Sequence, residues 1–144
     1  MRSRFRRRGF SLIEFLAVLA LMAIVAGIVT VSIRPLMLKG KQDAARAEVG
    51  NICNALEAYF GVYGQYPSNS EGLAALRRKS EKINESLLTQ DPIDPWGRPY
   101  QYNAPGRDGA PYEVICFGAD GREGGTGGDK DIVSWDLKDR AAKK

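Results

Sequence analysis

The sequence predicts an α+β protein in which one long N-terminal helix packs against a small three-stranded antiparallel sheet. Two observations carry this prediction. An apolar run and then an amphipathic stretch follow each other from Phe10 to Tyr63. Three short segments with strand character come later and are separated by turns rich in Gly and Pro. A helix with one apolar face and a short antiparallel sheet bury their apolar surfaces against each other in such a fold.

The first part of the helix is an apolar run over residues 10–33, which reads FSLIEFLAVLALMAIVAGIVTVSI and contains only one ionisable residue, Glu14. A helix of this length reaches roughly 36 Å, enough to cross a bilayer with some tilt. We therefore predict a membrane-spanning helix over residues 10–34.

A basic segment precedes the apolar run. MRSRFRRRG contains five arginines and no acid. In an ordinary export signal the apolar region is only about 7–15 residues long and a small-residue cleavage site follows it. Here the small residue, Gly9, precedes the run. Basic residues before the run outnumber those close behind it, which places the N-terminus in the cytoplasm and the C-terminal domain in the periplasm.

Charge and composition exclude several classes of function. The net charge is +4, but without the five leader arginines the chain has 16 basic and 17 acidic residues. The basic balance is therefore no argument for nucleic-acid binding. The chain has no histidine, which excludes Ser-His and Cys-His catalysis and histidine-based metal sites.

The second part of the helix is amphipathic from residue 36 to about Tyr63. Pro35 removes one intrahelical hydrogen bond and is expected to interrupt and kink the helix there. The apolar positions recur at helical spacing and are expected to face the core. They are Val49, Ile52, Cys53, Leu56, Tyr59, Phe60 and Tyr63. Gly64 supplies a stop signal.

After the helix, Ser68 and Glu71 form the capping-box pattern S-x-x-E, which predicts a short helix through Arg78. Residues 91–100 read DPIDPWGRPY. The two Asp-Pro pairs and the glycine favour consecutive turns, with Trp96 packed beneath them as an anchor.

The three predicted strands cover residues 100–102, 112–117 and 132–135, and the first two form a hairpin. A charged tail follows from Asp136. Cys53 and Cys116 are the only cysteines. A disulfide in an exported domain and two small buried apolar residues both remain open for them.

A glycine-rich loop over residues 118–131 separates the last two strands, and six of its fourteen residues are glycine. Ordering so much glycine is entropically costly, so the loop is either flexible or tied by other groups. Asp120, Asp129 and Asp131 are suitable ligands for calcium, which prefers hard oxygen donors. The spacing matches neither an EF-hand nor a phosphate-binding loop. Spacing alone leaves a calcium loop and a flexible loop both open.

The residues from Gly9 to Glu14 read GFSLIE and follow a short basic leader. This arrangement resembles the N-terminal signal of type IV pilins and type II secretion pseudopilins. The resemblance implies that a membrane prepilin peptidase cuts between Gly9 and Phe10 and that Phe10 is N-methylated. A charge in the hydrocarbon costs about 2.5–3.5 kcal/mol. We expect Glu14 to pair with the new N-terminal amine of a neighbouring subunit and so to set the register of assembly. The alternative is that the Glu14 side chain reaches the lipid headgroups and has no function.

Segments after the long helix make the resemblance more specific. Tyr66-Pro67, the segment EGLAAL over residues 71–76, and the segment DPWG over residues 94–97 are similar to the major pseudopilins of type II secretion systems. The loop that starts with FGADG and ends with DKDI is also similar to the corresponding loop of these proteins. The resemblance implies a pilin-like fold with a calcium-binding loop. Its implied ligands are the side chains of Asp120, Asp129 and Asp131 and the backbone carbonyls of Phe117 and Arg122, with Thr126 as a further candidate.

The resemblance also implies a function. The chain would be a non-enzymatic structural subunit of a periplasmic pseudopilus that drives folded proteins across the outer membrane. Its partners would be copies of itself, minor pseudopilins, the inner-membrane assembly platform and the prepilin peptidase. The implied organisation is a cleaved leader (1–9), a membrane and filament-core helix (10–34), a periplasmic domain (35–137) and a tail (138–144).

Two alternatives belong to other classes. A type IV pilin would build a surface fibre, but pilins more often close the C-terminal region with a disulfide-bounded loop. A single-pass membrane-anchored enzyme would need convergent catalytic groups, and the three aspartates of the loop are the only candidate cluster in the sequence.

Overall fold

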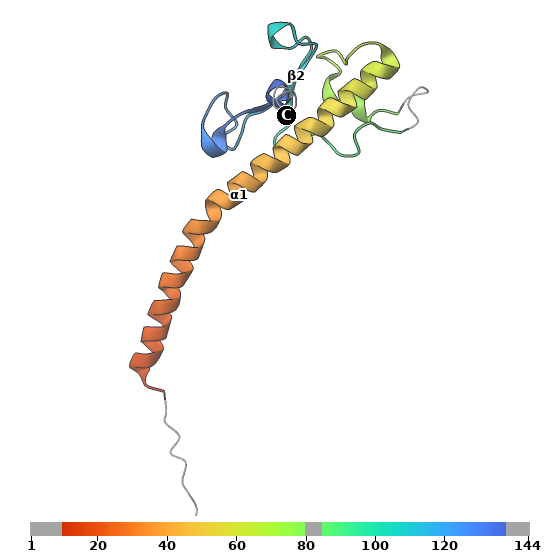
Figure 1. Ribbon diagram of the computed structural model, residues 1–144. Helices are drawn as coiled ribbons and strands as arrows, with labels where there is room; N and C mark the ends of the chain where they lie inside the picture. Colours follow the sequence, from red (N-terminus) through yellow and green to blue (C-terminus); the bar gives the residue numbers. More distant parts are fainter. Residues whose placement is uncertain (1–9, 80–84, 138–144) are drawn as a thin grey trace, which may run out of the picture. The chain divides into compact units, whose positions relative to one another are not determined.

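The computed structural model describes residues 10–79 and 85–137, without the side chains of residues 28–34. The predicted leader (1–9) and tail (138–144) lie outside the described residues. The chain divides into two compact units, residues 1–36 and residues 37–144. Figure 1 follows the chain from the start of the helix to the sheet. Each unit is described by itself below.

The helix α1 extends over Leu12–Tyr63 as one element with Pro35 inside it. The helix therefore continues through the expected interruption at Pro35, as the prediction of one long helix requires, because a proline removes only its own N–H from the helical ladder. The apolar side chains of residues 12–25 are mostly exposed on this chain, as Leu12 and Met22 illustrate. No helix in the described part of the chain combines the length and the apolar content needed to span a membrane.

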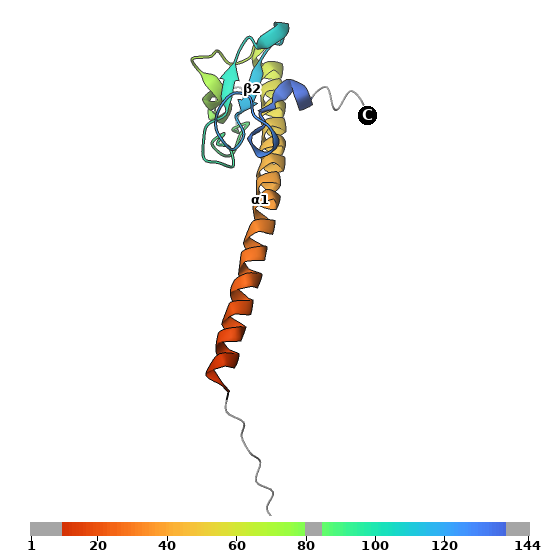
Figure 2. The ribbon, with the colours of Figure 1, turned by 90° about the vertical axis from the view of Figure 1, so that its left-hand side faces the viewer.

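The second unit contains the core. Val49, Ile52 and Leu56 of α1 are fully buried, which confirms the predicted apolar stripe. They join Val114 and Ile132 of the sheet in one hydrophobic cluster. The strands therefore lie alongside the C-terminal half of α1 (Figure 2). Burial of such side chains contributes about 1.5–3 kcal/mol each.

At the C-terminal end of the apolar stripe, Phe60 differs from the prediction and the stop at Gly64 agrees with it. Phe60 is 43% exposed, so its assignment to the core is wrong. Its ring instead stacks on that of Tyr66, with the centroids 4.8 Å apart. The stop at Gly64 is confirmed: its N–H donates to the Phe60 carbonyl at 2.8 Å, and its φ of 71° suits glycine.

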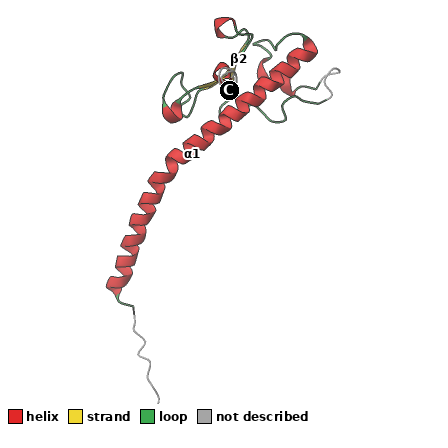
Figure 3. Cartoon of the chain, in the orientation of Figure 1, coloured by secondary structure: helices red, strands yellow, loops and turns green. Residues whose placement is uncertain are grey.

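Three short strands form one antiparallel sheet in the order β1, β2, β3. Figure 3 colours the chain by secondary structure and shows α1 as its longest element. They are β1 (Gln101–Asn103), β2 (Glu113–Cys116) and β3 (Ile132–Val133). Tyr102 pairs with Val114 and Cys116 with Ile132. The predicted sheet is confirmed, but the third strand is shorter than expected. Residues 134–137 are helical, and the Ser134 hydroxyl accepts a hydrogen bond from the Val114 N–H at 3.1 Å.

The capping box forms as predicted, but it precedes a 3₁₀ helix, η1 (Gly72–Arg77), rather than an α-helix. The Ser68 N–H donates to Glu71 Oε2 at 2.9 Å, and the Glu71 N–H lies 3.4 Å from Ser68 Oγ. The hydrogen bond from the Ser68 side chain lowers the pKa of Glu71. Two further 3₁₀ turns are η2 (Arg107–Gly109) and η3 (Gly127–Asp129).

Cys53 and Cys116 are not joined by a disulfide. Cys116 is buried on β2, and its thiol lies 3.7 Å from Asp94 Oδ2. Burial raises the pKa of the Cys116 thiol to about 11. Of the two possibilities that the sequence left open, the structure therefore has the small buried side chain at Cys116 and no disulfide.

Candidate functional site

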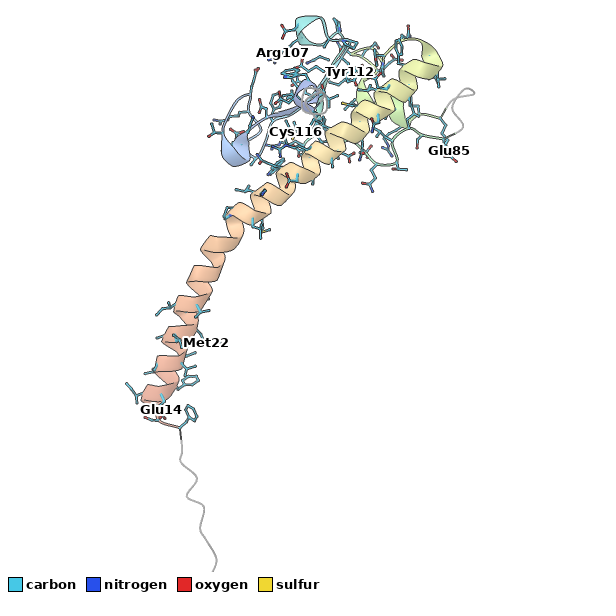
Figure 4. The ribbon with its side chains drawn as sticks, in the orientation of Figure 1. Glu14, Met22, Glu85, Arg107, Tyr112 and Cys116 are labelled. Atoms are coloured by element: carbon cyan, nitrogen blue, oxygen red, sulfur yellow. The ribbon has the colours of Figure 1, made fainter. Side chains whose placement is uncertain are left out.

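The N-terminal end of α1 carries Glu14 (Figure 4). Its Oε2 accepts a hydrogen bond from the Ser11 N–H at 2.8 Å, so the carboxylate caps the first turn of its own helix. A carboxylate in the first turn also interacts favourably with the helix dipole. Gly9 lies outside the described residues. The cleavage after Gly9, the N-methylation of Phe10 and the pairing of Glu14 with a second copy stay predictions.

The turn at residues 94–98 is built around Asp94, which is only 6% exposed. Its Oδ1 accepts hydrogen bonds from the Trp96 N–H at 2.9 Å and the Arg98 N–H at 2.8 Å. The backbone closes the same turn, because the Gly97 N–H donates to the Asp94 carbonyl. The predicted turn is confirmed, and Trp96 packs against the core cluster as expected.

Arg98 joins this turn to the glycine-rich loop. Its Nε lies 3.5 Å from Asp94 Oδ2, and its Nη2 donates to the Gly118 carbonyl. A Cβ at Gly121 would overlap the Arg98 guanidinium. The guanidinium therefore lies between a buried carboxylate on one side and the first turn of the loop on the other.

The loop itself forms two turns. In the first, the Gly121 N–H donates to the Phe117 carbonyl at 3.0 Å. In the second, the Asp129 N–H donates to the Thr126 carbonyl at 3.1 Å. A hydrogen bond of 3.1 Å from the Ala119 N–H to the Gly128 carbonyl joins the two turns. Backbone hydrogen bonds therefore order the loop along most of its length.

Helix α1 contacts the second turn of the loop. The Gln42 side chain donates to the Gly127 carbonyl. A Cβ at Gly128 would lie 3.3 Å from a methyl carbon of Leu38. A side chain at Gly128 would therefore crowd the helix, which gives this glycine a packing role.

Arg107 ties the middle of the loop. Its Nη2 donates to Glu123 Oε1 at 2.9 Å, and its Nε lies 3.3 Å from Oε1 of Glu113, a residue that is 1% exposed. These residues line a small cavity of about 60 Å³ together with Asp131. Figure 4 labels Arg107 near Tyr112, which precedes β2.

The structure does not gather the three loop aspartates. Within residues 10–79 and 85–137, no three acidic or cysteine side chains are grouped closely enough to hold a metal. Asp120 is exposed, and its Oδ1 accepts from the Arg122 N–H at 3.1 Å. Asp129 is also exposed, and its carbonyl is the group that a Cβ at Gly118 or Gly125 would meet. Each aspartate thus lies against a different part of the loop.

Asp131 is the aspartate whose geometry fits an oxygen-binding cation. Its Oδ2 accepts from the Gly124 N–H at 2.8 Å, whereas its Oδ1 is buried and has no hydrogen-bond partner among the described residues. A buried carboxylate oxygen without a donor is costly. The donor set of the loop consists of carboxylates and carbonyls, which is the chemistry that calcium selects. The implied carbonyl ligand Phe117 already accepts one hydrogen bond from Gly121 and keeps a second lone pair.

Sequence reasoning missed Asp94, Arg98 and Arg107 as residues that organise the loop. A weak signal existed for Arg98, since an Asp and an Arg stand four residues apart in a predicted turn. No signal existed for Arg107, because its partners Glu113 and Glu123 come from separate segments.

Comparison with known proteins agrees with this fold. The family model described as type II secretion system (T2SS), protein G, matches residues 34–135, and the model of the prokaryotic N-terminal methylation motif matches residues 4–30. Type II secretion system core protein G of Pseudomonas aeruginosa is 36% identical over 140 residues, covering 92% of this chain and 98% of the relative. The protein of the same name from Aeromonas hydrophila is 35% identical, covering 93% and 96%.

A solved structure is also similar. The crystal structure of the major pseudopilin from the type 2 secretion system of enterohaemorrhagic Escherichia coli matches with a TM-score of 0.52 and 26% identity. The match covers 69% of this chain and 93% of that one. The resemblance inferred from the GFSLIE and DPWG segments is confirmed, and the chain belongs to the type II secretion system protein G family.

Proposed function

We propose that this chain is a major pseudopilin, a structural subunit that assembles with copies of itself into the periplasmic pseudopilus of a type II secretion system. The single observation that supports this most is the protein G family match over residues 34–135 together with the methylation motif at residues 4–30. In this role the growing filament drives folded proteins across the outer membrane, and the chain performs no catalysis.

The proposed assembly uses the first unit of the chain. Its apolar side chains from Leu12 to Val25 are exposed on the single chain. Large exposed apolar surfaces indicate a lipid or protein partner. We propose that this segment anchors the subunit in the inner membrane, with the second unit in the periplasm, and packs against other copies in the filament. Minor pseudopilins, the assembly platform and the prepilin peptidase are the further proposed partners.

We also propose that the loop over residues 117–131 binds calcium. Asp131 supplies the buried oxygen that lacks a donor. Asp120, Asp129, the carbonyls of Phe117 and Arg122, and Thr126 are the remaining proposed ligands. Calcium would draw the three separated carboxylates together and offset their mutual repulsion.

The function is tested by complementation. A bacterium whose own protein G gene is deleted should regain secretion of its folded exoproteins when it expresses this chain. Gly9→Ala should abolish that rescue and leave an uncut precursor, which mass spectrometry of the membrane fraction would detect. Surface fibres at native expression, with no effect on secretion, would instead support a type IV pilin. If a chain that lacks residues 1–34 also rescued secretion, the proposal that the apolar helix is retained for assembly would be contradicted.

A further inference from the structure

We propose that Arg98 is a built-in cation that positions the first turn of the glycine-rich loop, residues 117–121, so that the chain itself holds this half before any added ion binds. The inference uses the loop of the proposed function, but it does not depend on calcium being the ion that this loop binds.

The first step of the argument is how Arg98 is held. Its N–H and its Nε both face Asp94, whose carboxylate is almost fully buried. Arginine presents donors in a rigid planar fork, so fixing one edge of the guanidinium also fixes the direction of the other. Asp94 therefore sets where the far edge of Arg98 points.

The second step is what that far edge meets. Nη2 donates to the Gly118 carbonyl, and Nη1 lies against Gly121 with no room for a side chain between them. Gly118 and Gly121 both have positive φ, 53° and 72°. Glycine adopts this left-handed backbone without strain, and the missing side chain at Gly121 leaves room for the Arg98 guanidinium.

The third step is the contrast with the other half of the loop. Residues 124–131 include Asp131, whose Oδ1 has no donor in the described part of the chain. The half near Arg98 thus has a cation from the chain itself, and the half near Asp131 has a carboxylate oxygen without one. An added cation that also used ligands of the first turn would find that turn already ordered, so its largest ordering effect is expected in the second half.

Hydrogen exchange at two backbone amides distinguishes the halves. The Gly121 N–H bonds to Phe117 and reports the first turn, whereas the Gly124 N–H bonds to Asp131 and reports the second half. The Val114 N–H, bonded to Ser134 in the core, reports global opening. We would measure these three amides by NMR on the full chain in detergent micelles, with EDTA and then with calcium.

The main variant is Arg98→Lys, which keeps a charge for Asp94 but lacks the second arm that reaches Gly118. In EDTA, Gly121 exchange should rise about tenfold or more, the size expected for losing a charge-assisted hydrogen bond, with Val114 unchanged. Arg98→Gln should raise it at least as much. The matched control is Arg77→Lys, because Arg77 also pairs with an aspartate, Asp91, but away from the loop. This control variant should leave the hydrogen-exchange rate of the Gly121 amide unchanged.

Three outcomes would overturn the inference: unchanged Gly121 exchange in both Arg98 variants, an equal rise at Val114, or an equal rise in the Arg77 control. Calcium should slow Gly124 exchange in the unsubstituted chain more than Gly121 exchange. If calcium changes neither amide, the calcium proposal fails, while the result for Arg98 in EDTA still decides this inference.

Discussion

Asp94 and Asp131 lie in the same unit, but their carboxylates have different surroundings. Asp94 is 6% exposed, and both of its oxygens have partners from the chain: two backbone N–H groups at Oδ1, and Arg98 and the Cys116 thiol at Oδ2. Asp131 has one oxygen bonded to Gly124 and one buried oxygen without a donor in the described residues.

This difference separates aspartates whose carboxylates receive hydrogen bonds from the chain from those that need a group from outside it. A buried carboxylate is tolerated when the chain supplies its donors, and it then needs no added ion. A carboxylate whose second oxygen lacks a donor depends on something outside the chain. The two segments look alike in the sequence, because each combines aspartates with glycine turns, and only the donors distinguish them.

The largest effect is expected from Asp94→Ala. The change removes the charged acceptor of two backbone N–H groups, and hydrogen bonds to a charged group contribute about 1.5–3 kcal/mol each. It also removes the partner of the Arg98 side chain, which is 35% exposed. Urea melts of the full chain in detergent should show this loss equally in EDTA and in calcium. Asp91→Ala is the control, because Asp91 is exposed and its pairing with Arg77 is worth about 0–1 kcal/mol. A loss that appears only in calcium would place Asp94 in the ion site instead.

A smaller and conditional effect is expected from Asp131→Ala. With calcium at about 100 times its dissociation constant, binding stabilises the unsubstituted chain by about 2.7 kcal/mol, and the variant should forfeit most of it. In EDTA the variant loses only the bond from Gly124, about 0.5–1.5 kcal/mol. Thermal melts in both conditions measure the difference. Asp43→Ala, on the exposed face of α1, is the control. Equal shifts with and without calcium would show that Asp131 acts without an ion.

The smallest effect concerns Cys116, which reports on the environment of Asp94. Burial raises the pKa of its thiol from 9.0 to about 11. The folded state therefore keeps its proton where the unfolded state loses it, so this contribution to stability is complete below pH 9 and declines as the pH rises toward 11. At pH 8, iodoacetamide should alkylate Cys53 first, with Cys116 at least about tenfold slower, because the thiolate is the reactive form. Mass spectrometry of the labelled chain measures both sites.

The same labelling sharpens the comparison. In Asp94→Ala, Cys116 should lose its protection, whereas in Asp131→Ala it should keep it. Equal labelling of Cys53 and Cys116 in the unsubstituted chain would contradict the buried environment of Cys116 altogether.

Much of the fold was predictable because it follows from local pattern. The apolar spacing of Val49, Ile52 and Leu56 predicted the buried face of α1. The alternation at residues 100–102 and the turn at residues 105–109 predicted the hairpin, and Ser68 with Glu71 predicted the capping box. The errors lie at the ends of elements. Phe60 fits the spacing but is 43% exposed, and Trp135 follows a strand that ends after Val133.

The candidate site was less predictable. The sequence indicated the loop and its aspartates, because glycine and aspartate in such density are unusual. It did not indicate that Arg98 and Arg107 anchor the loop, since Arg98 reaches Gly118 across 20 positions and Arg107 reaches Glu123 across 16.

By itself, the sequence determined which segments are helix, strand and turn, and which family they belong to, because apolar periodicity and turn residues act over a few neighbouring positions. The tertiary structure alone decided which carboxylates receive donors. That outcome depends on which distant side chains are brought within hydrogen-bond reach once α1 and the sheet have packed, and no local pattern encodes it.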